Sequence, residues 1–167
     1  IYQIHLDFFT PKNQYEQKEY DGRVLFQNAT RDNHQITFLS GTSCHHQAHY
    51  DVLFSFSGTN YVGEIKCRNQ GFNCFPDWAI DKYKWHRLLD VCQYLNTHAK
   101  RTSKTKFLPA LVQFNSDSTF TIYDASIASS IRTKNCPQNN LKESKRFEKR
   151  MCFFDKTKMI FQAKMRS

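Results

Sequence analysis

Residues 50–69, YDVLFSFSGTNYVGEIKCRN, combine two acidic residues and a lysine with the pattern of a β-hairpin. Two runs rich in β-branched and aromatic residues flank the sequence SGTN, which is typical of a tight turn. Alternate residues of a strand project from the same face of a sheet. The hairpin therefore places Asp51, Glu64 and Lys66 on one side.

A turn at residues 58–59 gives the register that we expect for this hairpin. It places Asp51 opposite Lys66, and Glu64 then faces Leu53. Direct cross-strand partners lie roughly 5 Å apart and diagonal partners roughly 7–8 Å apart. Both carboxylates and the ammonium group are therefore expected within reach of one bound ion.

The two carboxylates of this hairpin predict a divalent cation. Neighbouring acids in an otherwise apolar sheet repel each other and are poorly solvated, and a bound cation offsets both effects. Mg²⁺ prefers oxygen ligands, and it polarises a phosphoryl oxygen and acidifies water. Lys66 would stabilise the developing charge or orient the attacking water. The alternative is a solvated surface salt bridge, against which the apolar neighbours Leu53 and Val62 on the same face argue.

The flanking segments predict a mixed α/β chain with a helix between the third and fourth strands. The clearest helix begins near Pro76, with Asp77 as its N-cap and an apolar stripe at helical spacing. The basic tail ends in one more strand, MCFF or MIFQ. The expected elements are helices over 11–30 and 76–101 and strands over 36–39, 50–56, 61–67, 107–115 and 120–126.

These elements and motifs resemble, in their order, the PD-(D/E)xK nuclease superfamily. The resemblance runs over residues 15–126 and is carried by Asp51, by EIK at 64–66 after a glycine-containing hairpin, by DWAIDKYKW and by LPALVQFN. Tyr50 stands where the family pattern has a proline. The resemblance implies a restriction-endonuclease-like core, a mixed central β-sheet flanked by helices in the order α-β-β-β-α-β.

The resemblance also implies roles for residues of the hairpin. It makes Asp51 and Glu64 ligands of Mg²⁺ or Mn²⁺, with the main-chain carbonyl of Ile65 completing the metal site. It makes Lys66 the catalytic lysine. The implied reaction is metal-dependent hydrolysis of a phosphodiester bond.

Two further catalytic residues are implied in the helices on either side of the hairpin. Members of the superfamily often have an acid in the first helix, and Glu16 in QYEQ fits that position. Glu19 shares its helical face and is the alternative. Some members have a basic residue in the helix after the hairpin, where Lys84 is the first candidate and Lys82 the second.

The chain is strongly basic, with 24 Lys and Arg against 15 Asp and Glu and a formal net charge of +9. Such a surplus in a small domain favours phosphate backbones or anionic surfaces as partners. Nucleic acid, DNA rather than RNA, is the expected partner. Each basic residue near the hairpin could instead belong to a solvated helix face, and the C-terminal segment could instead be a soluble amphipathic helix. The candidate nucleic-acid contacts are Arg68, Lys82 and Arg87 near the hairpin, and Lys145, Arg146, Lys149 and Arg150 in a basic C-terminal segment from about residue 132.

Length and composition are those of one domain over residues 1–167, with 40% apolar and 23% charged residues. No stretch approaches the roughly 18 apolar residues of a membrane span. Irregular cysteine spacing and a start unlike a signal peptide predict reduced thiols in a cytoplasmic protein, of bacterial, viral or other origin. The sequence has no glycine-rich phosphate loop, no Ser-His-Asp order and no dinucleotide fingerprint. This argues against a kinase, a serine hydrolase and a dehydrogenase, respectively.

A zinc site is an alternative use of the cysteines and histidines. Cys and His bind zinc in tetrahedral geometry, but the spacing matches no standard zinc motif. A polar loop that contacts phosphate explains the same residues. The residues concerned are Cys44, His45, His46 and His49, with Cys67 and Cys74 as further candidates.

The sequence therefore predicts a Mg²⁺- or Mn²⁺-dependent endonuclease that acts on DNA. The alternative is a nucleic-acid-binding module that has the same fold and does not cleave. The complete set of Asp51, Glu64 and Lys66 favours the enzyme, since a pure binder does not need all three. Cutting both strands of a duplex with one site per chain would suggest a homodimer.

Overall fold

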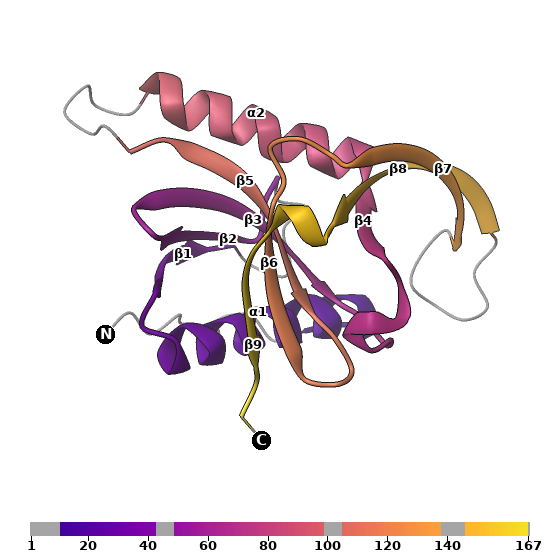
Figure 1. Ribbon diagram of the computed structural model, residues 1–167, viewed down its shortest axis with the longest axis horizontal. Helices are drawn as coiled ribbons and strands as arrows, with labels where there is room; N and C mark the ends of the chain where they lie inside the picture. The colour runs from indigo at the N-terminus through magenta and orange to yellow at the C-terminus, as the bar shows by residue number, and fades with distance from the viewer. Residues whose placement is uncertain (1–10, 43–48, 99–104, 138–145, 167) are drawn as a thin grey trace.

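The computed structural model describes residues 11–42, 49–98, 105–137 and 146–166. These residues form two helices on a large sheet, with a smaller sheet beside it (Figure 1). The helices are α1 (Gln14–Asp32) and α2 (Lys82–His98), with short 3₁₀ turns η2 (Phe72–Cys74) and η3 (Lys156–Lys158). The strands are β1 (Ile36–Gly41), β2 (Val52–Phe56), β3 (Thr59–Cys67), β4 (Asp77–Asp81), β5 (Phe107–Phe114), β6 (Thr119–Asp124), β7 (Ser130–Pro137), β8 (Arg146–Asp155) and β9 (Met159–Lys164).

The large sheet has the strand order β1-β2-β3-β5-β6-β9, in which β3 and β5 are parallel and the other neighbours antiparallel. A parallel pair needs a crossover connection, and α2 lies in it. The two helices cover opposite faces of the sheet (Figure 1). The predicted mixed α/β class and the α-β-β-β-α-β order are confirmed, with β4, β7, β8 and β9 added to them.

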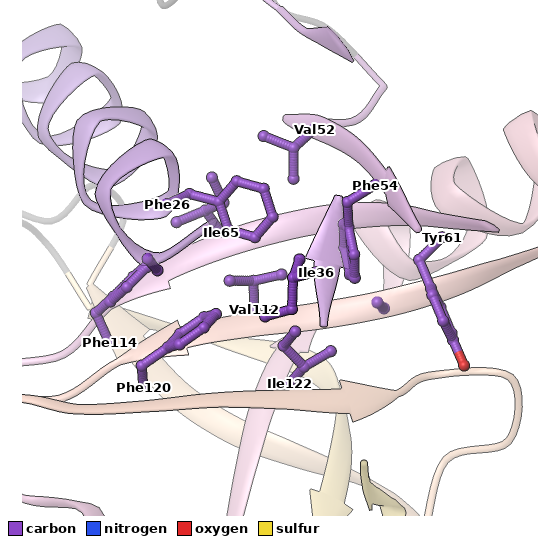
Figure 2. Packing of buried hydrophobic residues seen from close by; sticks show 12 residues of the cluster. Phe26, Ile36, Val52, Phe54, Tyr61, Ile65, Val112, Phe114, Phe120 and Ile122 are labelled. Carbon is purple, nitrogen blue, oxygen red and sulfur yellow. The ribbon is translucent and has the colours of Figure 1, made fainter. Parts of the chain in front are cut away.

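Helix α1 is fixed by a cap and by aromatic packing. The side chain of Asn13 accepts a hydrogen bond from the Glu16 N–H, which satisfies one of the free donors at the helix start. Phe26 is fully buried, and its ring lies 5.3 Å from that of Phe54 and 6.3 Å from that of Phe120, centroid to centroid (Figure 2). This packing holds α1 against the middle of the large sheet.

Gly22 brings α1 unusually close to β3. A Cβ atom at this position would lie 3.0 Å from Cγ2 of Ile65, tighter than ordinary van der Waals contact. The sequence marks this glycine as a weak point of the helix. In the structure the missing side chain lets α1 pack closely on Ile65, and the next residue, Arg23, contacts Asp51.

The hairpin turn lies one residue earlier than predicted. Ser57 and Gly58 form its two central positions, with φ of 50° and 79°, and positive φ at both positions is what a type I′ turn needs. The predicted turn at 58–59 was wrong, since Thr59 pairs with Phe56. The last pair is Val52 with Gly63, so Asp51 comes level with Glu64 rather than Lys66.

The segment after η2 begins with a strand, not with the predicted helix. Residues 77–81 form β4, in which Trp78 and Ile80 are buried and pair with Phe154 and Cys152 of β8. The predicted N-cap Asp77 was therefore wrong. Helix α2 starts at Lys82, and Oδ1 of Asp81 accepts a hydrogen bond from the Tyr83 N–H (2.8 Å). Pairing with a distant strand outweighs the local helix signal.

The described part of the C-terminal segment is β-structure. The small sheet has the order β4-β8-β7, with both pairs antiparallel. MCFF lies in β8 and MIFQ in β9, so both are strands, and the alternative of an amphipathic helix in this segment was wrong for residues 146–155. Neither described helix is long and apolar enough to cross a membrane.

Candidate active site

Asp51 is a buried carboxylate just before β2. Its backbone N–H donates to the carbonyl of Gly63 (2.9 Å), which ties it to β3. Its Oδ2 accepts the N–H of Ile65 (2.7 Å), and its Oδ1 accepts Nη2 of Arg23 (2.9 Å). Both carboxylate oxygens are therefore oriented by groups from other elements.

Arg23 reaches Asp51 from α1, although it is not among the site residues predicted from the sequence. Only 3% of its side chain is exposed. Its Nε donates to the carbonyl of Thr42 (2.6 Å), and its Nη1 donates to the carbonyl of Glu19 (2.9 Å) and to Oε2 of Glu19 (3.2 Å). The signal that was available is a Glu–Arg pair four residues apart on one helical face, next to a glycine.

Glu64 forms ion pairs with two lysines from different elements. Its Oε1 accepts Nζ of Lys84, from α2, at 2.7 Å and Nζ of Lys66, from β3, at 3.0 Å. Burial would raise the pKa of Glu64, but the two ammonium groups outweigh burial and lower its pKa to about 2. Burial alone would lower the pKa of Lys84, but the negative charge of Glu64 outweighs burial and raises it.

The negative charge of Glu64 affects the ionisation of Asp51. Burial raises the pKa of Asp51, the negative charge of Glu64 raises it further, and Arg23 only partly reverses the increase. The pKa of Asp51 is thereby raised to about 7. Close carboxylates of this kind are the arrangement in which a cation is held.

Of the two candidate acids of α1, Glu19 is ion-paired with the arginine that binds Asp51. Glu19 is ion-paired with Arg23, and its charge also raises the pKa of Asp51, after burial and Glu64. Glu16 lies in the first turn of α1, where its Oε2 accepts the N–H of Lys12 (2.7 Å). The structure therefore places Glu19, the alternative of the two, beside Arg23, and the catalytic role of either acid stays a prediction.

Tyr15 also borders the site, although no sequence signal identified it. Burial raises the pKa of its phenol most, and the charges of Lys84, Glu19, Glu64 and Asp51 act on it as well. Half of the residue is exposed, at 50%. Tyr15 thus lies at the solvent side of the carboxylate cluster.

The predicted nucleic-acid contacts near the hairpin have different surroundings. Arg68 is used internally: its Nη2 donates to the carbonyl of Ala79, and its Nε donates to Oε1 of Gln113 (3.4 Å). Burial lowers the pKa of Arg68 to about 10. Lys82 is the first residue of α2, and Arg87 lies over the ring of Tyr83 (5.3 Å). We therefore leave Arg68 out of the path that we propose for nucleic acid.

Three of the nucleic-acid contacts predicted in the C-terminal segment, Arg146, Lys149 and Arg150, lie in β8 of the small sheet. Lys149 forms an ion pair with Asp81 (3.4 Å), and Nζ of Lys149 lies 5.0 Å from the ring centroid of Phe147. Arg150 is exposed on β8, and Arg146 is the first residue of that strand. Lys145 lies outside the described residues.

Most of the predicted zinc cluster also lies outside the described residues, namely Cys44, His45 and His46. His49, Cys67 and Cys74 are exposed. Among the residues that the structure describes, no group of three or more Cys, His, Asp or Glu side chains is arranged to hold a metal ion.

The donor set of the carboxylate cluster fits an open Mg²⁺ or Mn²⁺ site. Asp51 and Glu64 offer carboxylate oxygens, and the hydrogen bonds from Arg23 and Ile65 each use one of the two lone-pair sites of an Asp51 oxygen. Mg²⁺ is commonly bound through one or two carboxylates, with water and substrate phosphate as its other ligands. Asp51, Glu64 and the carbonyl of Ile65 would hold such an ion.

No protein-family model matches the chain, and no curated protein matches it. Among solved structures, the chain is similar to Hjc, a Holliday junction resolvase from the archaeal hyperthermophile Archaeoglobus fulgidus, solved at 1.6 Å. The TM-score is 0.49 and the identity 7%, over 87% of this chain and 92% of that chain.

Proposed function

We propose that this protein is a Mg²⁺- or Mn²⁺-dependent endonuclease that hydrolyses phosphodiester bonds of DNA. One observation carries the proposal: Asp51, Glu64, Lys66 and Lys84 come together from three separate segments of the chain. Two buried carboxylates beside two partly exposed ammonium groups are suited to a metal ion and a phosphate at the same place.

The two lysines share two tasks in this proposal. Both keep Glu64 ionised, which a buried carboxylate without counter-charge would not be. The side chain of Lys66 is 22% exposed and that of Lys84 34%, so both remain accessible to an incoming phosphate. Their charges would stabilise the additional negative charge of the transition state. A bound metal ion would supply polarisation of the phosphoryl oxygen and a more acidic water.

The basic residues around α2 and β8 define the path proposed for DNA. Strand β4 leads directly into Lys82 and α2, and it pairs with β8. The ion pair of Lys149 with Asp81 joins the basic part of β8 to the start of α2. Lys82, Lys84 and Lys149 thus form a basic series that leads to Glu64, which suits a phosphate backbone.

A second candidate is a nucleic-acid-binding module that does not cleave. It is favoured by the charge balance of the site, since three acids face three cations among the residues described above. Asp51, Glu64 and Glu19 are matched by Arg23, Lys66 and Lys84. A cluster that is neutral on its own residues is compatible with a purely structural role.

A cleavage assay separates the two candidates. Supercoiled, linear, single-stranded and branched DNA, with RNA of matched sequence, would each be incubated with Mg²⁺, with Mn²⁺ and with EDTA. The enzyme cleaves at least one DNA form, and EDTA stops it. Binding of the same DNA without cleavage under every metal condition would support the module instead.

A further inference from the structure

Arg23 is bonded at every nitrogen of its guanidinium group. The partners are the carbonyls of Thr42 and Glu19, the hydroxyl of Thr42 (3.1 Å from Nη2) and the carboxylates of Glu19 and Asp51. These hydrogen bonds hold the planar guanidinium in one orientation, whereas the side chain of a surface arginine is mobile. The position of Arg23 is therefore determined by the fold.

The bond from Arg23 puts a full positive charge 2.9 Å from Asp51 at a site with little solvent. Only 6% of Asp51 is exposed, so screening by water is weak. A divalent cation at Asp51 would approach this guanidinium and be repelled by it. The same guanidinium already offsets the charge that would otherwise attract the ion.

We propose that Arg23 is the permanent counter-ion of Asp51 and that it keeps the affinity of the free protein for a divalent cation low. This inference rests on the proposed metal site. Lys66 and Lys84 play the same part at Glu64, but they are partly exposed, whereas Arg23 is buried against the carboxylate. The site would therefore fill with metal mainly when a phosphate adds negative charge to it.

Calorimetric titration with Mn²⁺ alone, without nucleic acid, tests the inference. Arg23→Gln keeps a polar side chain and removes the charge, so the variant should bind Mn²⁺ about tenfold or more tightly than the parent. Arg23→Lys keeps the charge and should stay within about threefold of the parent. Arg31→Gln, on the exposed last turn of the same helix, removes the same charge from the chain and should change nothing.

A folded Arg23→Gln variant that binds Mn²⁺ no more tightly than the parent would overturn the inference. If the variant is unfolded without metal, Mn²⁺ should restore its circular dichroism, because the ion replaces the lost counter-charge. Failure of Mn²⁺ to do so would also overturn the inference.

The cleavage assay shows whether a negative result contradicts the inference about Arg23 or the proposed nuclease function. Cleavage by the parent together with an unchanged Mn²⁺ affinity in Arg23→Gln contradicts the inference alone. Tighter Mn²⁺ binding in Arg23→Gln, with no cleavage by the parent on any substrate, contradicts the proposed function alone.

Discussion

At the scale of single residues, the ionised state of Glu64 depends on partners from two elements. The residue is only 4% exposed, and a buried carboxylate without counter-charge is costly. Lys66 comes from the same strand, two residues away, while Lys84 comes from α2. The position of α2 against the sheet is therefore part of the chemistry of Glu64.

Lys66→Ala and Glu64→Gln should each lower the DNA cleavage rate about 100-fold or more, because the first removes the positive charge that stabilises the reacting phosphate and the second removes the charge of a proposed metal ligand. Thermal melts should show both variants folded, since Lys66 is partly exposed and Gln has nearly the shape of Glu. Arg31→Gln serves as the matched surface control and should cleave like the parent. Full activity in either site variant would contradict the nuclease assignment.

Asp51→Asn should weaken binding of Mn²⁺, measured by calorimetry, because it removes a charge from a site of oxygen ligands. It should also lower the free energy of unfolding by about 1–3 kcal/mol, because the amide has one acceptor oxygen where the carboxylate serves both Arg23 and Ile65. Mn²⁺ affinity equal to that of the parent would show that Asp51 is not a ligand.

At the scale of elements, the site depends on how closely α1 approaches β3. Gly22 allows this approach, and the next residue, Arg23, then reaches across to Asp51. Ile65, against which Gly22 lies, is 7% exposed and belongs to the core cluster of α1. The side chain that an added methyl group would meet therefore has little room to move.

Gly22→Ala should consequently destabilise the protein by about 1–2 kcal/mol, measured by chemical denaturation. Within an ordinary helix the same change stabilises by roughly 0.5–1 kcal/mol, so the expected sign is reversed by the contact with Ile65. Lys18→Ala, at an exposed position of α1, should stay within about 0.5 kcal/mol of the parent. A more stable Gly22→Ala variant would show that α1 is free to shift.

At the scale of the whole molecule, basic residues of two elements extend toward the carboxylates. The small sheet carries basic residues that continue to the start of α2 and to Lys84 at the carboxylates. Lys134 and Lys149 are direct cross-strand partners on β7 and β8, and like charges so placed repel each other. A bound phosphate backbone would relieve this repulsion.

Replacing Lys149 and Arg150 by Ala should lower DNA affinity about equally for unrelated sequences, because phosphate contacts carry no sequence information. The slope of log affinity against log salt should become shallower by up to about 0.9 for each lost contact to duplex DNA. The measurement uses a Glu64→Gln background, in which we expect cleavage to be about 100-fold slower or more. Adding Lys145→Ala and Arg146→Ala extends the test to the whole predicted basic segment.

The matched control replaces Lys156 and Lys158, on η3, and removes the same charge. It should leave both affinity and slope close to those of the Glu64→Gln parent. An unchanged slope in the β8 variant would move the DNA path to Lys82, Lys84 and Arg87.

The sequence alone determined which residues of the hairpin share a face. Strand side chains alternate with a period of two, so Asp51, Glu64 and Lys66 share a face in any pairing that differs from the predicted one by an even number of residues. The real turn moved the pairing by two residues and left the face unchanged, bringing Asp51 level with Glu64. The catalytic roles of these residues remain predictions.

Only the tertiary structure decided which charges meet. Arg23 and Asp51 are 28 positions apart, and their contact depends on where α1 docks, which no local pattern encodes. Strand β4 depends in the same way on β8, some 70 residues later, since its five residues have a strand-like alternation but also follow a good helix-start signal. Periodicity is a property of neighbouring residues, whereas ion pairs between elements are set by packing of the whole core.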